Sequence, residues 1–246
     1  MLLTVPTLLA FLLGFVQAVS WSIVLPENNT WVEQQLIVAV PPYPNEDIFG
    51  PWIFSACFFP SNSCRPSYCP NPYTVGEVNP ANPSPGFPQK WAVNLMAIPW
   101  NYTSGGVIQS QGLWVAEGDK ISSRSTWEAD QHEWMQRAKD PNGKMSPHEV
   151  ELTSPASNWK GDGAGDDNTH QVVCESQLYG DQTSYWNFPV TFIGMIFRAA
   201  NSNGVATACR SASSTGVDGD VTAEGFRMPD AQSCYWDTLT FTPWRE

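Results

Sequence analysis

The chain has 246 residues, with 24 acidic and 12 basic side chains and a formal net charge of −12 at pH 7. A surface with this charge repels phosphate backbones, which argues against nucleic acid as a partner. The length suits a single domain with a full hydrophobic core.

The first 18 residues carry no charged side chain and are almost wholly apolar. They end in Val16-Gln17-Ala18, small residues at the spacing that a signal peptidase accepts. We therefore predict a signal peptide over residues 1–18 and a secreted, extracellular domain over residues 19–246, with no membrane contact after cleavage. A membrane anchor is the alternative, but the run is at the short limit of a bilayer span and lacks flanking positive charges.

Short apolar or alternating runs recur through the remaining chain, separated by Gly, Pro, Asn and Ser. Their period of two, their length and their content of β-branched and aromatic residues predict β-strands. The runs are residues 31–40, 52–59, 90–98, 107–115, 148–152, 171–175, 188–197 and 235–242.

Helix signals are scarce. Residues 127–139 could form a turn or two of helix, and Asp140-Pro141-Asn142-Gly143 then predicts a tight turn. No alternation of strands and helices is present. The expected fold class is all-β, a two-sheet antiparallel β-sandwich of the jelly-roll or concanavalin-like kind with long, disulfide-pinned loops.

One such loop is expected over residues 60–89, which hold eight of the 21 prolines and few aliphatic side chains. Proline cannot donate to a sheet ladder, so this segment reads as a long loop.

The number of cysteines is even, which in a secreted chain predicts three disulfides of open connectivity. Zinc is the alternative for Cys64 and Cys69, but no nearby histidine or Cys-x2-Cys pair completes a tetrahedral set. Two sequons, at Asn28 and Asn101, predict N-linked glycans on the surface. The six cysteines are Cys57, Cys64, Cys69, Cys174, Cys209 and Cys234.

The chain has 12 tryptophans, many for its length. Four of them stand in polar or turn-like contexts: Trp100, Trp127, Trp134 and Trp159. Exposed aromatic rings mark interaction sites, so we expect these four to contact a sugar or an extended peptide. The alternative is that they pack against one another under loops.

Three glutamates and a histidine are candidate catalytic residues. Glu149 and Glu151 share one face of a predicted strand, about 6.6 Å apart, within the range that glycosidases use. An ordinary solvated strand face gives the same pattern. Glu175 follows an apolar Val-Val-Cys run whose burial would suit a general acid, with His170 nearby to orient a substrate. An exposed glutamate at the rim of a strand is the alternative.

Metal and cofactor chemistry have little support. Acidic Gly-containing turns could supply oxygen ligands to calcium, but Asp-Gly pairs are first of all turn formers and the EF-hand spacing is missing. We expect neither a metal nor a cofactor, and no Gly-x-Ser-x-Gly, Walker or His-Glu-x-x-His pattern is present. The acidic turns contain Asp162, Asp166 and Asp167, and Asp218 and Asp220.

Leu113-Trp114-Val115-Ala116-Glu117-Gly118-Asp119-Lys120-Ile121 resembles a "hydrophobic-x-V-x-x-G-D-x-I" segment of fungal secreted proteins related to the glutamic peptidases, or eqolisins. The resemblance spans about residues 91–199 and implies a sandwich of two long antiparallel sheets. The family's "L-Q-T-G" strand would fall at Asn94-Leu95-Met96-Ala97, which has no glutamine. Its glutamate-bearing strand would bring His170 or Glu175 to the critical position, according to register. The resemblance therefore implies the fold and a fungal, extracellular origin, and not proteolysis.

The leading hypothesis is a glycoprotein that binds an extended glycan or peptide through an aromatic-lined concave sheet. The alternatives are an extracellular enzyme that uses Glu175, or Glu149 with Glu151, on a glycan, a peptide or a small secreted metabolite, and a host- or wall-interacting surface protein.

Overall fold

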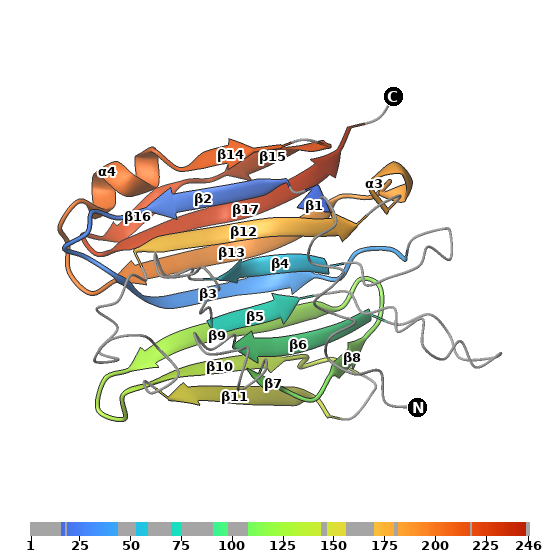
Figure 1. Cartoon of the computed structure of the whole chain (residues 1–246), viewed down its shortest axis with the longest axis horizontal. Coiled ribbons are helices and arrows are strands. Elements are labelled where there is room, and N and C mark those ends of the chain that lie inside the picture. Colours follow the sequence, from blue (N-terminus) through green and yellow to red (C-terminus); the bar gives the residue numbers. More distant parts are fainter. Residues whose placement is uncertain are drawn as a thin grey trace.

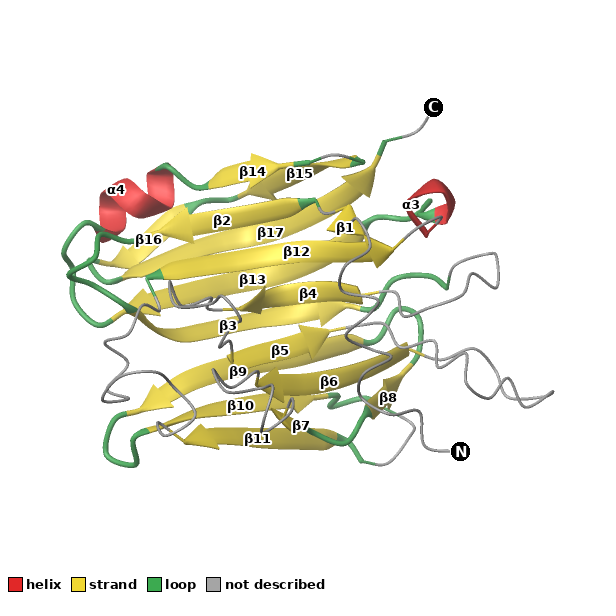
Figure 2. Ribbon diagram, viewed as in Figure 1, coloured by secondary structure: helices red, strands yellow, loops and turns green. Residues whose placement is uncertain are grey.

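The computed structural model describes residues 16–17, 19–43, 53–58, 70–74, 91–97, 108–143, 147–155, 170–179, 182–216 and 218–244. These residues form an all-β structure of two antiparallel sheets with two short helices, α3 (Gln182–Tyr185) and α4 (Val205–Arg210). The strands of the two sheets run in nearly the same direction, one sheet behind the other (Figures 1 and 2). No helix within these residues has the length and apolarity needed to cross a membrane.

The first sheet has nine strands, in the order β14-β2-β12-β4-β5-β6-β7, with β1 paired to β12 and β8 paired to β6. Its strands are β1 (Val16–Gln17), β2 (Ser20–Val24), β4 (Ile53–Phe58), β5 (Pro70–Thr74), β6 (Trp91–Ala97), β7 (Ile108–Gln109), β8 (Leu113–Val115), β12 (Gln171–Tyr179) and β14 (Ser213–Thr215).

The second sheet has eight strands, in the order β11-β10-β9-β3-β13-β17-β15, with β16 paired to β17. Its strands are β3 (Trp31–Ala39), β9 (Lys120–Glu128), β10 (Glu133–Lys139), β11 (Glu149–Pro155), β13 (Val190–Ala199), β15 (Gly219–Glu224), β16 (Arg227–Asp230) and β17 (Ser233–Pro243).

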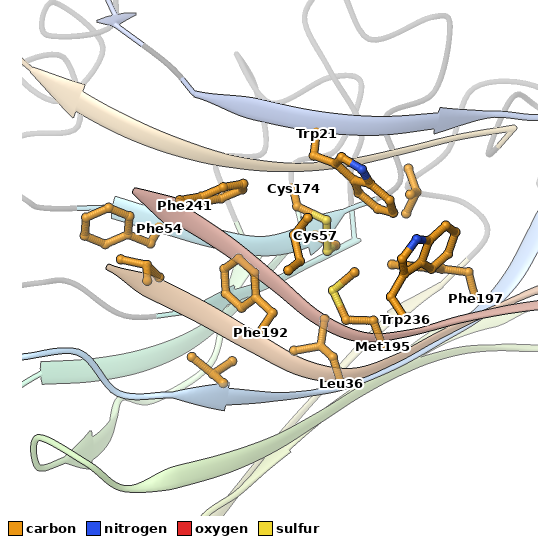
Figure 3. Packing of buried hydrophobic residues seen from close by; sticks show 14 of the residues in the cluster. Trp21, Leu36, Phe54, Cys57, Cys174, Phe192, Met195, Phe197, Trp236 and Phe241 are labelled. Atoms are coloured by element: carbon orange, nitrogen blue, oxygen red, sulfur yellow. A yellow bond between two sulfur atoms is a disulfide. The ribbon is translucent and has the colours of Figure 1, made fainter. Parts of the chain in front are cut away.

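The hydrophobic core lies between the two sheets because alternate side chains of each strand point to the same face. Trp21 on β2 packs edge-on against Trp236 on β17, with ring centroids 5.0 Å apart, and also contacts Phe197 on β13 (Figure 3). Each fully buried large apolar side chain contributes about 1.5–3 kcal/mol. These aromatic contacts join the two sheets into one sandwich, which confirms the predicted fold class.

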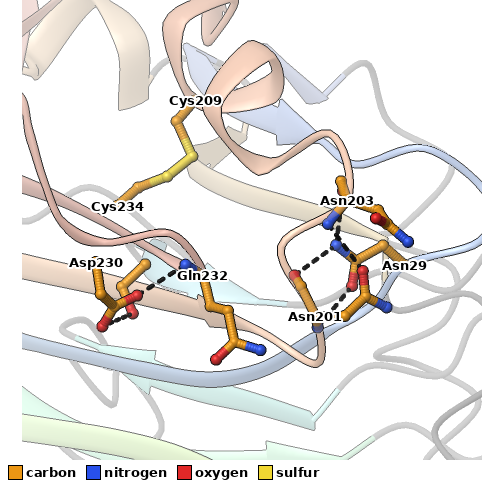
Figure 4. The surroundings of a disulfide bond; sticks show 8 residues. Asn29, Asn201, Asn203, Cys209, Asp230, Gln232 and Cys234 are labelled. Atoms are coloured by element: carbon orange, nitrogen blue, oxygen red, sulfur yellow. Dashed lines mark hydrogen bonds between the residues drawn. A yellow bond between two sulfur atoms is a disulfide. The ribbon is translucent and has the colours of Figure 1, made fainter.

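Two disulfides reinforce the sandwich. Cys57 on β4 bonds to Cys174 on β12, and Cys209 on α4 bonds to Cys234 on β17 (Figure 4). The second bond ties α4 to the sheet beneath it. The prediction of disulfides is confirmed for these four cysteines, whereas Cys64 and Cys69 lie outside the described residues.

The prediction of a helical turn within residues 127–139 is wrong. This segment contains the end of β9, a turn at residues 129–132 and all of β10, so it is a β-hairpin. The strands were missed because their inward positions include Ser123, Ser125 and Gln136, which are polar yet buried and so erase the alternation of apolar and polar residues. The turn predicted at Asp140 is present, and the Asn142 N–H donates to the Asp140 carboxylate at 3.1 Å.

The prediction of an uninterrupted loop over residues 60–89 is also wrong, because β5 lies within it. Pro70 and Pro72 are two positions apart, so the N–H groups that they lack would both point toward the same neighbouring strand. Pairing to β6 runs along the strand from Pro70 to Tyr73, while pairing to β4 involves only Tyr73 and Thr74. A strand with so little pairing on one side tolerates both prolines.

The N-terminal part of the described chain adds to the first sheet. Val16 and Gln17 pair with Tyr179 and Leu178 of β12. The Val19 side chain is buried, and its backbone N–H donates to the Ser176 hydroxyl at 3.0 Å. The first residue after the predicted cleavage point is therefore fixed against the sheet.

Candidate ligand-binding site

The two outer faces of the sandwich differ in charge. On the eight-stranded sheet, outward positions carry six of the seven lysines and arginines that the structure describes: Lys120, Arg124, Arg137, Lys139, Arg198 and Arg227. Described outward positions of the nine-stranded sheet are mainly Ser, Val, Gln and Asn, with Glu175 as a carboxylate. Charge is therefore concentrated on one face.

Most of these cations form ion pairs with carboxylates on neighbouring strands. Arg124 donates from Nε and Nη2 to Oε1 of Glu33, both at 2.9 Å. Arg137 contacts the carboxylates of both Glu149 and Glu151. The hydrogen bond that Arg137 donates to Glu151 is the main cause that raises the pKa of its guanidinium, and the charges of Glu151 and Glu149 add to it.

The Glu149 and Glu151 pair is therefore part of an exposed ion-pair ladder. Their side chains are 41% and 43% exposed, and both contact Arg137. A general acid and its partner need different environments to divide their roles. Here both carboxylates have the same partner and similar exposure, so the geometry favours the solvated strand face over catalysis.

Glu175 and His170 belong to the other sheet and lie apart. Glu175 is half-buried on β12, and the register sets it opposite Ser20 on β2 and Ser55 on β4. The same row continues from Ser55 to Tyr73 and Asn94. At about 4.8 Å per strand, Glu175 and Asn94 are about 14 Å apart, too far to bind one water together.

His170 precedes β12 and is buried, so desolvation lowers the pKa of its imidazole, with a smaller opposing effect from Glu27. Its backbone carbonyl accepts a hydrogen bond from Leu25 at 2.7 Å. The five residue steps from His170 to Glu175 span about 16 Å along the strand. The structure does not bring them into one site.

A pocket of about 230 Å³ lies where β3, β9 and β13 of the eight-stranded sheet end together. The polar residues of its lining are Arg198, Glu33, Thr126 and Gln232. The rest of its lining comes from Trp127, Val32, Ala199 and Ala200. A tryptophan together with several polar residues is a composition that suits ligand binding.

Two charged residues, Glu33 and Arg198, line this pocket, and Arg124 and Asp230 lie near them. Glu33 and Arg198 are cross-strand partners in the register, yet the Glu33 carboxylate pairs with Arg124. Asp230 accepts hydrogen bonds from the Gln232 N–H and the Ser233 hydroxyl, and the Gln232 N–H is the main cause of its lowered pKa. Arg198 is exposed and forms no ion pair with any residue that the structure describes.

The four candidate tryptophans have different outcomes. Trp127 is partly buried, packs against Trp134 at 5.8 Å and lines the pocket. Trp134 has no exposed surface, so the expectation that it contacts a ligand is wrong. The reason is that it lies on the inward face of β10, between the sheets. Trp100 and Trp159 lie outside the described residues.

Most described indoles pack in the core and do not line an outer face. Six of them are buried: Trp21, Trp31, Trp91, Trp134, Trp186 and Trp236. The exposed ones are Trp114 on β8, at 40%, and Trp244 after β17, at 55%. These two indoles do not stand out in the sequence, because both lie in or directly after apolar strand segments typical of core residues.

The sequon at Asn28 lies in a turn that exposes its side chain. The adjacent Asn29 is buried and donates to the backbone carbonyls of Asn201 and Asn203 at 2.9 and 2.8 Å (Figure 4). These bonds fix the turn against the loop before α4 and leave Asn28 accessible. Asn101, the second sequon, lies outside the described residues.

Within the described ranges, no three His, Cys, Asp or Glu side chains group in a way that could hold a metal ion. Asp162, Asp166 and Asp167 are not among those residues. No model of a known protein family matches the chain, and no curated protein is similar to it.

Proposed function

We propose that the protein is a secreted, disulfide-bonded glycoprotein that binds an extracellular glycan or peptide at the pocket formed by Trp127, Arg198, Glu33, Thr126 and Gln232. The apolar N-terminal segment, the two disulfides and the exposed Asn28 sequon support secretion and glycosylation. The eqolisin-like segment supports a fungal source.

One observation carries the binding proposal: Trp127, Arg198 and Gln232 line the same pocket, at the ends of three adjoining strands and a turn. Sites built on strands hold their side chains in a fixed geometry, which lowers the ordering cost of binding. The ligand is therefore expected to contact the ends of these strands, and not an extended concave aromatic surface.

The test is binding of the purified, secreted protein to insoluble polysaccharides and to soluble oligosaccharides and peptides, followed by tryptophan fluorescence. Trp127→Leu should weaken binding at least about tenfold, which corresponds to about 1.4 kcal/mol. The matched control is Trp114→Leu, which removes an indole exposed on the other sheet and should leave binding unchanged.

Because Trp127 packs against Trp134, its replacement also affects stability, so the melting temperature is measured for each variant. Gln232→Ala is a second variant, which removes a polar side chain that a surface turn contributes to the pocket. Equal binding by wild type, Trp127→Leu and Gln232→Ala would contradict the proposal.

The second candidate function is a carboxylate-based enzyme that uses Glu175. It is supported by the half-buried position of Glu175 between the serines at positions 20 and 55 of neighbouring strands. Glu175→Gln should then abolish turnover of a glycan, peptide or small metabolite while ligand retention persists. Turnover that is lost in Glu175→Gln and kept in Trp127→Leu would favour the enzyme over the binding protein.

A further inference from the structure

We infer that the N-terminal leader is removed between Ala18 and Val19, and that the α-ammonium group freed on Val19 is held inside the sandwich by the carboxylate of Asp218. This inference goes beyond the proposed ligand binding and rests on the predicted signal peptide. It is argued from the strand pairing around the cleavage point, from the burial of Val19 and from a buried carboxylate oxygen that lacks a partner.

The strand that contains the cleavage point continues across it. Residues 16–17 pair with residues 178–179 of β12, and Ser20 pairs with Glu175 further along the same strand. These pairs share one register, so β1 and β2 lie in line beside β12 (Figure 1). Cleavage after Ala18 therefore places the new chain end within the sheet and not in a loop.

The backbone of Val19 is fixed by Ser176. The Val19 N–H donates to the Ser176 hydroxyl at 3.0 Å, and the Val19 carbonyl accepts a hydrogen bond from the Ser176 N–H at 2.9 Å. Both side chains are buried. The nitrogen that cleavage would free is therefore already enclosed between the sheets.

Cleavage changes the charge of this nitrogen. Hydrolysis of the Ala18–Val19 bond adds one water. The oxygen of the water stays on Ala18, which leaves as a carboxylate, and both of its protons pass to the Val19 nitrogen, which becomes an ammonium group. A peptidase cannot reach a buried bond, so this step precedes folding, and the charged chain end is enclosed when the sheets assemble.

A buried ammonium group needs a carboxylate beside it, because an unpaired charge is costly away from water. The segment between β14 and β15 packs against Val19: a Cβ placed on Gly216 would lie 3.8 Å from Val19 Cγ1, and one on Gly219 would lie 3.1 Å from Val19 Cγ2. Between these glycines stands Asp218, whose Oδ2 is buried and has no hydrogen-bond partner among the described residues. The segment thus supplies the charge that the ammonium group requires.

The strand register places Asp218 on the appropriate side of Val19. β14 is antiparallel to β2 and pairs Thr215 with Ser20, so Gly216 falls beside Val19. Continuing in the same direction, Asp218 lies beyond Val19 toward residue 17. The freed nitrogen is on this side of Val19.

Two other carboxylates in this part of the fold are less well placed. Glu175 alternates with the inward Ser176 on β12, so its side chain faces the outer side of the sheet. Asp220 is exposed on β15. Asp218 is therefore the best-placed counter-ion among the described residues.

The first test is the N-terminal sequence of the secreted protein, which should begin at Val19. The second compares the melting temperatures of the mature protein and of a form that keeps residues 17–18 before Val19, each with and without Asp218→Asn. In the mature protein the substitution leaves a buried ammonium group unpaired and should lower the melting temperature by at least about 5 °C. In the extended form the nitrogen is an uncharged amide, so Asp218→Asn should leave the melting temperature unchanged or raise it.

Asp220→Asn is the matched control, because it removes the same charge from an exposed position two residues away. It should leave both melting temperatures nearly unchanged. A further readout needs the mature protein alone. A carboxylate partner raises the folded pKa of the α-amino group, so the stabilisation is complete below the unfolded value of about 8 and is lost as the pH rises through the folded value. The effect of Asp218→Asn should shrink over the same range.

A first residue other than Val19, an equal effect of Asp218→Asn in the mature and extended forms, or an effect that is independent of pH would overturn the inference. None of these measurements involves a ligand, so their failure leaves the proposed binding function untouched.

Discussion

Two strand pairs of the same sheet, β13–β17 and β9–β10, use their inward faces in opposite ways. The first pair turns Phe192, Phe197, Trp236 and Phe241 inward. The second turns inward Ser123, Ser125 and Gln136, together with Trp134 and Ala138. One pair is stabilised by aromatic packing, and the other keeps hydroxyls and an amide between the sheets.

The polar half of the interior depends on hydrogen bonds for its stability. Gln34 on β3 donates to the backbone carbonyl of Cys57 at 2.9 Å and lies 3.5 Å from the Ser125 hydroxyl. A buried amide stabilises the fold only when its groups are paired, but it also fixes the register of the strands that supply its partners. We therefore expect β13–β17 to contribute more to stability than β9–β10, which carries part of the charged outer face.

The largest expected effect comes from the aromatic pair. Phe192 has no exposed surface and packs at 5.5 Å against Phe241. Phe192→Ala should lower the free energy of unfolding by about 3–5 kcal/mol, because it removes apolar contacts and leaves a cavity. Ser125→Ala in the polar pair should cost about 1 kcal/mol. Denaturant unfolding followed by circular dichroism compares the two variants. Equal losses of stability would contradict the expected difference between β13–β17 and β9–β10.

The next effect concerns the disulfide that anchors β17. Cys209 and Cys234 are 25 residues apart, so replacing both with alanine should destabilise the fold by about 3 kcal/mol through the entropy of the unfolded chain. Unfolding of the double variant and of the wild type under non-reducing conditions measures this loss. A stability equal to wild type would mean that α4 packs on the sheet without needing the bond.

The pH dependence of stability should reveal the buried carboxyl of Asp140, which directly follows β10. Asp140 is 1% exposed, and desolvation raises the pKa of its carboxyl in the folded state, with partial opposition from the Asn142 N–H. Because the folded pKa lies above the unfolded one, the ionised form costs stability once the pH exceeds the folded pKa. This cost disappears as the pH falls through the folded and then the unfolded value.

Asp140→Asn should therefore be more stable than wild type at pH 7 and lose this advantage as the pH falls toward about 4, near the unfolded pKa of aspartate. Melting temperatures of both proteins across this range provide the measurement. An advantage that stays constant with pH would point to a hydrogen-bond effect and not to ionisation.

The smallest effect is expected on the outer face of β9–β10. Arg137 is 50% exposed, so Arg137→Gln should cost less than about 1 kcal/mol, and the difference should shrink in high salt. Unfolding at low and high ionic strength checks this. A loss of several kcal/mol that is insensitive to salt would mean that the ladder of Arg137, Glu149 and Glu151 is a structural element of the sheet.

Sequence patterns predicted the parts of the fold in which burial and alternation agree. The expected strand at residues 235–242 lies within β17, where apolar residues alternate with threonines, and that at 188–197 overlaps β13, which is rich in β-branched and aromatic residues. The β9–β10 hairpin escaped prediction because its inward polar residues are buried only in the presence of the opposite sheet.

The candidate site was predictable only in part. Trp127 stood out for its polar context, but nothing local relates it to Arg198 and Gln232, which are more than 70 positions away in the chain. The Glu149 and Glu151 spacing was read correctly as a shared face, yet their common arginine partner belongs to the neighbouring strand.

The sequence by itself determined that the chain is built of antiparallel strands and carries cysteines suited to disulfides, because side-chain periodicity and cysteine number are local properties. The tertiary structure alone decided which indoles are enclosed, which cysteines pair and which arginines form ion pairs. These outcomes depend on strand order and register, through which residues distant in the chain compete for the same partners and the same interior space.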